Sequence, residues 1–516
     1  MAVDRRGFLT ALGGGGAAVL AGAGPAAALG GGSRSGRTTS SVDAWPTRAR
    51  TSPHSPHAAP DWKALRRRLG SRLILPGDRG YAVQRLGFNE LNDGQYPAAI
   101  ARCASAADVQ ACLDVARGHG LPIAARSGGH SYLGYSVPSG GLVLDLRLMS
   151  QVQVRRDGTA VVGAGARLIE VYYALAAAGR LLPAGSCPTV GVSGLTLGGG
   201  IGVLARKYGL TCDRVAAAEV VTADSHLRTA SPTSEPGLYW ALRGGGGGNF
   251  GVVTEFTFRT EPAPGLTVFS LRFPSGSAAE VIGAWQHWIA NAPFEMWASC
   301  QVSGGNPPTA HLVGCYVGGT TAANRLLDRL VSAAGVRPIS RSVVPKSYLG
   351  AMKYMAGCSN DSLAQCHPVS EGGRLPRESF VAVSRMLGSR PLDAGRVTDL
   401  MHGHTGVDLL LDSLGGAVSQ LRPDATAFPH RDSLASAQIY AGTTSAGRRQ
   451  ATRTVDGIRD GLARLGATGA YVNYIDAGLP DWGHAYYGAN LPRLKSVAHQ
   501  YDPDGVFAFR QSVTRG

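Results

Sequence analysis

The sequence predicts an α+β protein in which glycine-rich loops follow short strands. From Ala106 to His119, apolar residues recur at the spacing of an amphipathic helix, and the apolar run 122–125 then has the length of a strand. Directly after that run stands Arg126-Ser127-Gly128-Gly129-His130-Ser131, a glycine loop at a strand end. Such a loop can turn several backbone N–H groups towards one anionic group.

The pattern continues along the chain and then changes. Further strands are expected at 142–146, 160–163 and 216–222, and a helix at 168–178. After Pro262 the segments become longer and alternating. Two more helices are expected there: 278–290 and 320–334. This change indicates a second domain.

Charge and length exclude some classes of protein. The chain has 516 residues, 44% of them hydrophobic, and a net charge of +15. Its longest basic run is Arg66-Arg67-Arg68, with no interleaved aromatic residues, so we expect no nucleic-acid partner. No segment is apolar and long enough to predict a membrane anchor.

The N-terminal sequence has the pattern of an export signal. Asp4-Arg5-Arg6-Gly7-Phe8-Leu9 is a twin-arginine pattern, and Ala26-Ala27-Ala28 offers a small-residue cleavage site. We therefore expect a signal peptide at 1–30, a partnership with the twin-arginine export machinery and a secreted protein. Residues 31–60, rich in Ser, Thr, Pro and Gly, are expected to form a flexible linker.

Eight cysteines in an exported chain suggest some disulfides. Cys358 and Cys366 flank a short polar loop, and Cys300 and Cys315 flank an expected hairpin turn. Both pairs are candidate disulfides. Three others are expected to be buried structural thiols: Cys103, Cys112 and Cys212.

One glycine motif has a competing interpretation. Gly200-x-Gly202-x-x-Ala205 matches the dinucleotide fingerprint of doubly wound folds. That fingerprint needs a preceding strand and an acid at the end of the next strand. No strand signal precedes this loop, and Glu219 falls inside its strand, so we reject the doubly wound fold.

Four ordered motifs, from about residue 90 to the C-terminus, carry a family resemblance. They are the surroundings of His130 (Arg-Ser-Gly-Gly-His-Ser-Tyr) and of Cys187 (Gly-Ser-Cys-Pro-Thr-Val-Gly), the segment 240–254, and a tail running from Tyr471-Val472-Asn473-Tyr474 to 501–504. The chain resembles the berberine-bridge-enzyme-like branch of the vanillyl-alcohol oxidase flavoproteins. The resemblance implies a PCMH-type FAD-binding domain in two parts, 61–263 and 466–516, and a substrate domain, 264–465, with an antiparallel β-sheet covered by helices.

The resemblance also implies a flavin held by two covalent bonds. His130 would bond the 8α-methyl group of FAD and Cys187 would bond ring carbon 6; both side chains are nucleophilic enough for this. No metal is expected. Further cofactor-binding residues are expected to be Arg126, Ser127, Gly128, Gly129, Ser131, Val190, Gly191, Val192, Ser193, Gly194, Leu195, Gly200, Ile201, Gly202, Gly251, Val253 and Asn473.

Oxidation of an alcohol carbon needs a base for the hydroxyl proton. The resemblance points to Tyr474 as this catalytic residue, with Tyr471 and Tyr354 as second choices. Alternatively, Tyr474 only packs over the flavin. Val190 matches a position that goes with oxidases, which favours O2 as acceptor and H2O2 as product, whereas Leu195 replaces a His of many relatives and puts the strength of oxygen reactivity in doubt.

The expected activity is oxidation of a hydroxyl group on a small molecule: a sugar, an oligosaccharide or a glycosylated secondary metabolite. Three alternatives stay open: a dehydrogenase with another electron acceptor, an oxidative cyclase that forms C–C or C–N bonds, and an inactive secreted flavin-binding protein. A carbohydrate-binding protein without flavin would leave His130 and Cys187 without a role.

Overall fold

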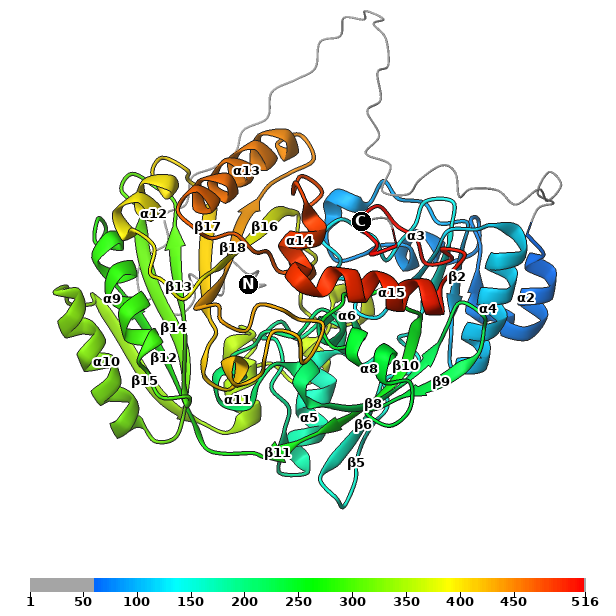
Figure 1. The fold of residues 1–516 in the computed structure, drawn as a ribbon, viewed down its shortest axis with the longest axis horizontal. Coiled ribbons are helices and arrows are strands. Elements are labelled where there is room, and N and C mark those ends of the chain that lie inside the picture. The colour runs from blue at the N-terminus through cyan, green and yellow to red at the C-terminus, as the bar shows by residue number, and fades with distance from the viewer. Residues whose placement is uncertain (1–59, 515–516) are drawn as a thin grey trace, which may run out of the picture.

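Strand pairing organises the chain around three large sheets in this computed structural model, which describes residues 60–514 (Figure 1). The first is a four-stranded sheet in the order β1-β2-β4-β3. Its strands are β1 (Leu73–Ile74), β2 (Ala99–Arg102), β4 (Leu142–Asp145) and β3 (Ile123–Arg126). The last three run parallel because helix α4 (Ala106–His119) crosses between β2 and β3.

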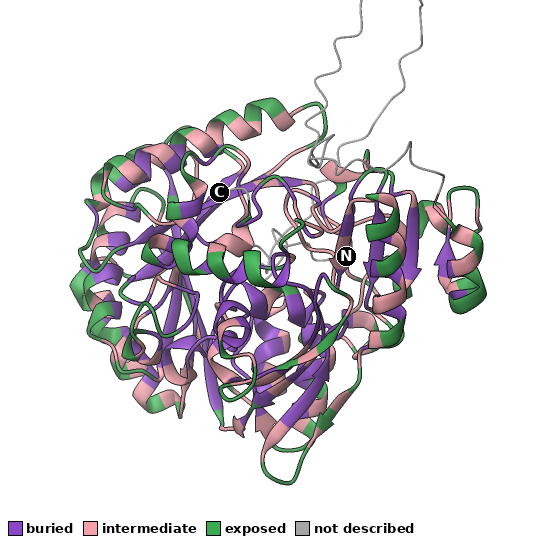
Figure 2. Ribbon diagram, turned by 45° about the vertical axis from the view of Figure 1, so that its right-hand side comes forward, coloured by how far each residue is buried: buried purple, intermediate pink, exposed green. Residues whose placement is uncertain are grey.

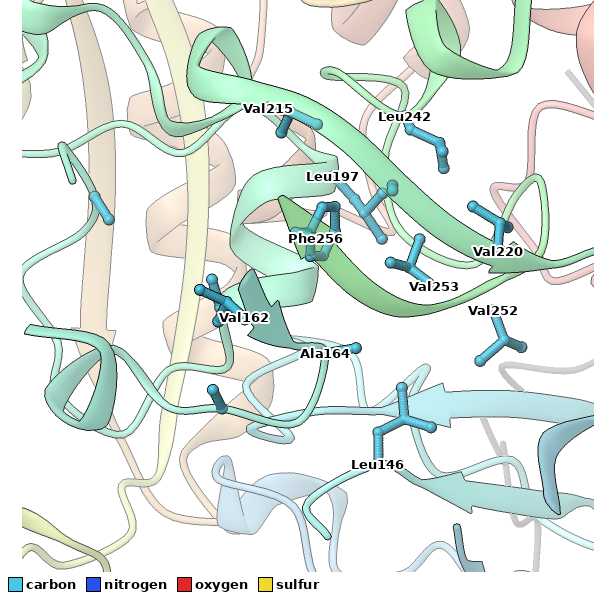
Figure 3. Packing of buried hydrophobic residues seen from close by; sticks show 14 of the residues in the cluster. Leu146, Val162, Ala164, Leu197, Val215, Val220, Leu242, Val252, Val253 and Phe256 are labelled. Carbon is cyan, nitrogen blue, oxygen red and sulfur yellow. The ribbon is translucent and has the colours of Figure 1, made fainter. Parts of the chain in front are cut away.

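The second sheet has five antiparallel strands in the order β5-β6-β10-β8-β9. They are β5 (Val152–Val154), β6 (Thr159–Gly163), β10 (Val252–Arg259), β8 (Val215–Val221) and β9 (Leu227–Ala230). Phe256 on β10 pairs with Val162 on β6, and both side chains belong to the core that Leu197 of helix α6 (Val192–Leu197) also enters (Figure 3). This packing fixes the loops at the strand ends.

The third sheet has seven antiparallel strands in the order β15-β12-β14-β13-β17-β18-β16. They are β15 (Ser340–Lys346), β12 (Leu266–Arg272), β14 (Thr309–Val317), β13 (Met296–Ser303), β17 (Val407–Ser413), β18 (Ala435–Gly442) and β16 (Phe380–Leu387). Four helices pack on one face: α9 (Ala278–Ala290), α10 (Thr320–Ala334), α12 (Ala394–Met401) and α13 (Arg448–Arg464). Exposed residues lie on the outer sides of the helices, whereas most central strands are coloured as buried (Figure 2). One buried hydrophobic cluster joins these helices to the sheet.

The C-terminal tail returns to the first two sheets. After α13 it forms η7 (Val472–Tyr474), α14 (Trp482–Tyr487) and α15 (Leu491–Tyr501), and α15 packs on α8 (Pro236–Ala241) (Figure 1). The remaining elements are short: α2 (Trp62–Leu69), α3 (Tyr81–Gln84), α5 (Leu168–Ala177), β7 (Arg180–Leu181), α7 (Ala205–Tyr208), β11 (Glu261–Pro262), α11 (Tyr348–Met355), and single 3₁₀ turns between them.

The α+β expectation is confirmed, and the predicted helices and strands of the first domain lie within one or two residues of the observed ones. The loop with the dinucleotide-like glycines follows helix α6 and not a strand, which confirms the rejection of a doubly wound fold. Within residues 60–514 no helix has the length and apolar character that crossing a membrane requires. The expected signal peptide and almost all of the expected linker lie outside the described residues.

The structure corrects one predicted disulfide. Cys300 and Cys315 lie on neighbouring strands, but their side chains point to opposite faces of the sheet, Cys300 into the helix-covered core and Cys315 into the core of the first domain. Because successive residues of a strand alternate between faces, these thiols cannot meet. Cys358 and Cys366 are also thiols here, yet they lie in one small buried cluster with Ile169. Cys103, Cys112 and Cys212 are buried thiols, as expected.

Candidate active site

A cavity of about 430 Å³ lies between the glycine loops of the first domain and the uncovered face of the seven-stranded sheet. Three parts of the chain meet in it. They are the loops 127–131 and 185–191, the tail residues 471–475, and strands β13, β17 and β18. Segments far apart in the sequence therefore share one chamber.

The two loops that carry His130 and Cys187 touch each other through backbone. A Cβ built on Gly128 would lie 2.2 Å from the backbone nitrogen of Gly191, so neither loop tolerates a larger residue there. Gly129 adopts a φ of +73°, which turns the chain back towards His130. The close approach brings the two candidate attachment residues to one wall.

Thr189 connects His130 and Cys187. Its hydroxyl oxygen lies 2.9 Å from Nε2 of His130 and 3.6 Å from Sγ of Cys187. The imidazole of His130 also stacks on Phe88, with ring centroids 3.9 Å apart. The imidazole and the thiol are thus held on either side of one hydroxyl group, facing the cavity.

The tail supplies the aromatic side chains of the chamber. Tyr474 stacks on Tyr132 with ring centroids 5.4 Å apart and meets Tyr471 edge to face at 5.0 Å. The Tyr471 hydroxyl accepts hydrogen bonds from the backbone N–H of Gly200 and from Nδ2 of Asn473. Burial raises the pKa of Tyr471 to about 12, which makes it a poor base.

The opposite wall is the seven-stranded sheet. Because strand residues alternate, every second side chain of β13, β17 and β18 points at the cavity. The lining residues of this wall are Trp297, Ser299, Gln301, Asp408, Leu410, Asp412, Gln438 and Tyr440. Most of them are polar, so this wall can recognise a polar substrate.

Comparison with known proteins places this chamber in a family. Residues 97–231 match the FAD binding domain model, and residues 470–514 match the model for berberine and berberine-like proteins. The FAD-linked oxidoreductase YgaK of Bacillus subtilis is 34% identical over 457 residues, which cover 86% of this chain and 97% of that protein. The chain belongs to the berberine-bridge-enzyme-like FAD-linked oxidoreductases.

Solved structures agree with the family membership. BBE-like 1 of Physcomitrella patens has a TM-score of 0.82 and 31% identity, covering 87% of this chain and 98% of that one. Glucooligosaccharide oxidase of Acremonium strictum, described with a 6-S-cysteinyl, 8α-N1-histidyl FAD, has a TM-score of 0.76 and 28% identity, covering 86% and 96%. The fold of this family member is thus the expected PCMH-type fold, and its cofactor is FAD.

The described residues fit an FAD. Six buried polar atoms of the residues that line the chamber have no hydrogen-bond partner among the described residues: the Tyr135 hydroxyl, Ser136 Oγ, Trp297 Nε1, Ser299 Oγ, Gln301 Oε1 and Gln511 Oε1. Unpaired buried polar atoms are costly, so a polar ligand is needed to satisfy them. The glycine loops add backbone N–H groups suited to phosphate oxygens.

Most of the predicted site residues of this family member line the chamber. They are His130, Cys187, Ser127, Gly128, Gly129, Ser131, Val190, Gly191, Ser193, Gly194, Leu195, Ile201, Gly202, Gly251, Val253, Tyr471, Asn473 and Tyr474. Three of the predicted contacts and one second-choice base lie outside the cavity lining. Arg126, Val192, Gly200 and Tyr354 do not line the cavity.

The position of each of these residues has a physical reason. Arg126 is 2% exposed and pairs with Asp145, its register partner on β4, at 2.8 Å. Val192 is the first residue of α6, and its side chain enters the core. The backbone N–H of Gly200 donates a hydrogen bond to the Tyr471 hydroxyl. Tyr354 lies on helix α11, within the hydrophobic core.

Thr189, Phe88 and the whole sheet wall were not predicted as site residues from the sequence. Thr189 stands two residues after Cys187, so its position in the Cys187 motif was a usable signal. For the residues of the sheet wall, the sequence offered only the alternation of side chains along each strand as a signal. That alternation identifies two faces but does not say which one meets the cavity.

Proposed function

We propose that this protein is an oxidase that holds FAD through covalent bonds to His130 and Cys187 and oxidises an alcohol carbon of a carbohydrate or secondary metabolite. Bound FAD would supply the hydride acceptor for this oxidation, with O2 as the final electron acceptor and H2O2 as the product. Export by the twin-arginine route, after the cofactor has been acquired in a folded chain, is part of this proposal.

The convergence of His130 and Cys187 on Thr189 is the observation that carries the proposal. Both attachments require a nucleophile at a fixed place beside one ring system. The 2.9 Å and 3.6 Å contacts to one hydroxyl oxygen hold the two nucleophiles together, although 57 positions separate them in the sequence. The glucooligosaccharide oxidase with a bicovalent flavin supports the same arrangement.

Tyr474 is the residue that takes the hydroxyl proton. It lines the chamber between the glycine loops and the sheet wall, and its ring is held by Tyr132 on one face and Tyr471 at an edge. A phenol fixed in this way presents its oxygen in a defined direction, which proton transfer requires. Tyr471 is the positioning residue beside it.

Acid denaturation tests the cofactor attachment. The purified protein is unfolded in acid, digested, and analysed by absorbance and peptide mass spectrometry. Flavin on the peptides that contain His130 and Cys187 is the expected result, and release of all the flavin would remove the bicovalent attachment. Val190 in the chamber supports O2 as acceptor; rapid reoxidation by air after anaerobic photoreduction is expected, whereas slow reoxidation would indicate a dehydrogenase.

A further inference from the structure

An ion-pair network lies behind the two attachment loops, 127–131 and 185–191. It joins five side chains in the order Arg167, Glu371, Arg147, Asp145 and Arg126. All five side chains lie outside the lining of the cavity. Glu371 is the centre of the network, because its carboxylate accepts hydrogen bonds from both Arg147 and Arg167.

One end of the network supports the first attachment loop. Arg126, the last residue of β3, is 2% exposed and pairs with Asp145 at 2.8 Å. Its side chain passes under Gly129, where an added Cβ would lie 3.5 Å from Cδ of Arg126. The placement of Arg126 therefore helps to set the path of the backbone immediately before His130.

The other end of the network supports the second attachment loop. Arg167 forms an isolated antiparallel β-bridge with Gly191 of that loop. The next residue, Leu168, donates its N–H to the carbonyl oxygen of Val190 at 3.0 Å. Arg167 is 5% exposed, and both terminal nitrogens of its guanidinium donate to the Glu371 carboxylate. A shift of this guanidinium is therefore passed to the loop through the bridge.

Glu371 comes from a distant part of the chain. It ends the 3₁₀ turn η5 (Val369–Glu371), which lies between helix α11 and strand β16. Arg147 and Arg167 stand 224 and 204 positions before it. Although burial acts to raise it, the two guanidinium groups hold the pKa of Glu371 below its usual value. One ionised carboxylate from the turn before β16 therefore joins the supports of both attachment loops.

The spacing of the two loops matters because both covalent bonds go to one rigid ring system. Its two attachment positions are fixed relative to each other, so the loops must present His130 and Cys187 at one separation. The loops touch at Gly128 and Gly191. The ion-pair network adds a second connection behind that contact.

We propose that Glu371 is a positioning residue for flavin attachment: by binding Arg167 and Arg147, it sets the two attachment loops at the spacing that both covalent bonds require. Glu371 acts through the two arginines, since it lies outside the cavity lining. This inference rests on the proposed function, because it presupposes covalent bonds from His130 and Cys187 to the flavin.

Each attachment consumes an oxidant. The N–H bond of His130 or the S–H bond of Cys187 and one C–H bond of the flavin are replaced by an N–C or an S–C bond. Two protons and two electrons are released with each bond, and O2 takes them up as H2O2. Attachment is therefore followed in air.

The kinetics of attachment in the full-length protein test the inference. The chain is produced under riboflavin limitation and then incubated with FAD in air. Peptide mass spectrometry at a series of times measures flavin on the His130 peptide alone, on the Cys187 peptide alone, and on both peptides joined through one flavin. Glu371→Gln keeps the shape of the side chain and removes its charge. It is expected to slow double attachment about tenfold and to let singly attached chains accumulate.

Further variants separate positioning from a loss of folding. Glu371→Asp keeps the carboxylate and is expected to restore most of the parent rate. Should Glu371→Gln fold poorly, Arg167→Lys keeps the charge but loses the two-pronged bond to Glu371 and gives the same reading. Glu295→Gln is the matched control, because the ion pair of Glu295 with Lys207, at 2.6 Å, also joins distant parts of the chain and includes no residue of either attachment loop. This control should attach flavin at the parent rate.

The outcomes separate this inference from the proposed function. Double attachment at the parent rate in Glu371→Gln, or equal slowing in Glu295→Gln, overturns the inference and keeps the oxidase. A lower urea midpoint with an equal loss of single and double attachment in Glu371→Gln also overturns it, because a loss of folded protein accounts for that result. A parent protein that never attaches flavin removes the covalent attachment of the proposed function, and this inference with it.

Discussion

The Tyr471 hydroxyl accepts a hydrogen bond of 2.9 Å from the backbone N–H of Gly200, a residue 271 positions earlier in the chain. This bond ties the C-terminal tail to the glycine loop of the first domain. The same oxygen accepts from the N–H of Ile201 and from Asn473. The Tyr471 hydroxyl therefore holds the glycine loop around Gly200 through its hydrogen bonds.

Tyr471→Phe is expected to destabilise the protein by about 1–3 kcal/mol, because it leaves buried N–H groups without an acceptor. The unfolding midpoint in urea measures this loss. Tyr173→Phe, at a tyrosine that is 49% exposed, is the control and should leave the midpoint in place. An unchanged midpoint in Tyr471→Phe would show that the hydrogen bonds to Gly200 and Ile201 add nothing to stability.

Tyr474→Phe tests the base. Removal of the phenol oxygen is expected to slow bleaching of the flavin by an alcohol substrate about 10²- to 10⁴-fold, the usual contribution of general base catalysis. The covalent attachment should stay complete, since the substitution keeps the ring that stacks on Tyr132 and meets Tyr471 edge to face. Anaerobic stopped-flow measurement of the reduction rate checks this. A rate within a factor of two of the parent protein would leave Tyr474 with a packing role.

Thr189→Val tests the hydroxyl that connects His130 and Cys187. The replacement keeps the shape but removes the contacts of 2.9 Å and 3.6 Å, so both nucleophiles lose a fixed neighbour. We expect a lower fraction of flavin attached to the His130 peptide, measured by peptide mass spectrometry after refolding with FAD. Thr189→Ser retains the hydroxyl and should retain full attachment. Equal attachment in both variants would exclude a role for this hydroxyl.

The sequence predicted the local elements and the flavin side of the chamber better than the substrate side. Helix 106–119 was predicted with its observed bounds because its apolar spacing and Gly120 define it locally. His130 and Cys187 belong to distinctive motifs. The ion pair of Arg126 with Asp145 could not be predicted, because it depends on strand register, which local patterns do not specify.

The place of the aspartates in the sheet wall could not be predicted from the sequence for a similar reason. Asp408 and Asp412 lie four positions apart on one strand, so they must share a face, but the sequence does not say which face. The helices α9 and α12 cover the other face, and only this packing shows that the acids meet the cavity. The incorrect Cys300–Cys315 pairing arose in the same way, from a hairpin whose register the sequence does not give.

His430 predicts how stability depends on pH. Its ring is partly buried with Nε2 3.0 Å from the carbonyl oxygen of Tyr486, and removal from solvent lowers its pKa from 6.5 to about 4. The unfolded chain therefore takes up a proton at higher pH than the folded protein. The free energy of unfolding is expected to fall by about 1.4 kcal/mol per pH unit from this one group as the pH decreases from about 6.5 to about 4.

Urea unfolding at a series of pH values measures this dependence. His430→Gln should lower the slope by one proton, and His311→Gln should do the same, because burial, with Arg272 nearby, also lowers the pKa of His311 to about 4. His226→Gln, with a side chain 75% exposed, is the control. If the free energy of unfolding depends on pH with the same slope in His430→Gln and His311→Gln as in the parent protein, other groups account for the loss of stability.

Cys358 and Cys366 are poised to form a disulfide in an oxidising medium. The Cys366 thiol donates a hydrogen bond of 3.8 Å to the carbonyl oxygen of Cys358, and the proximity of the two thiols raises the pKa of Cys358 and lowers the pKa of Cys366. A thiol with a lowered pKa is more often the thiolate that attacks in disulfide formation. Closing this short loop is expected to add about 2–3 kcal/mol to the free energy of unfolding.

Refolding in a glutathione buffer followed by non-reducing peptide mapping detects the bond. The expected product is one cross-linked peptide pair, Cys358 with Cys366, and a higher urea midpoint than in the reduced protein. Cys300 and Cys315, on opposite faces of the sheet, serve as internal controls and should remain thiols. Cys358→Ala should refold with no change in midpoint between oxidised and reduced buffer. If the parent protein behaves like this variant, the two thiols do not pair, and their contact is only a packing feature of the cluster around Ile169.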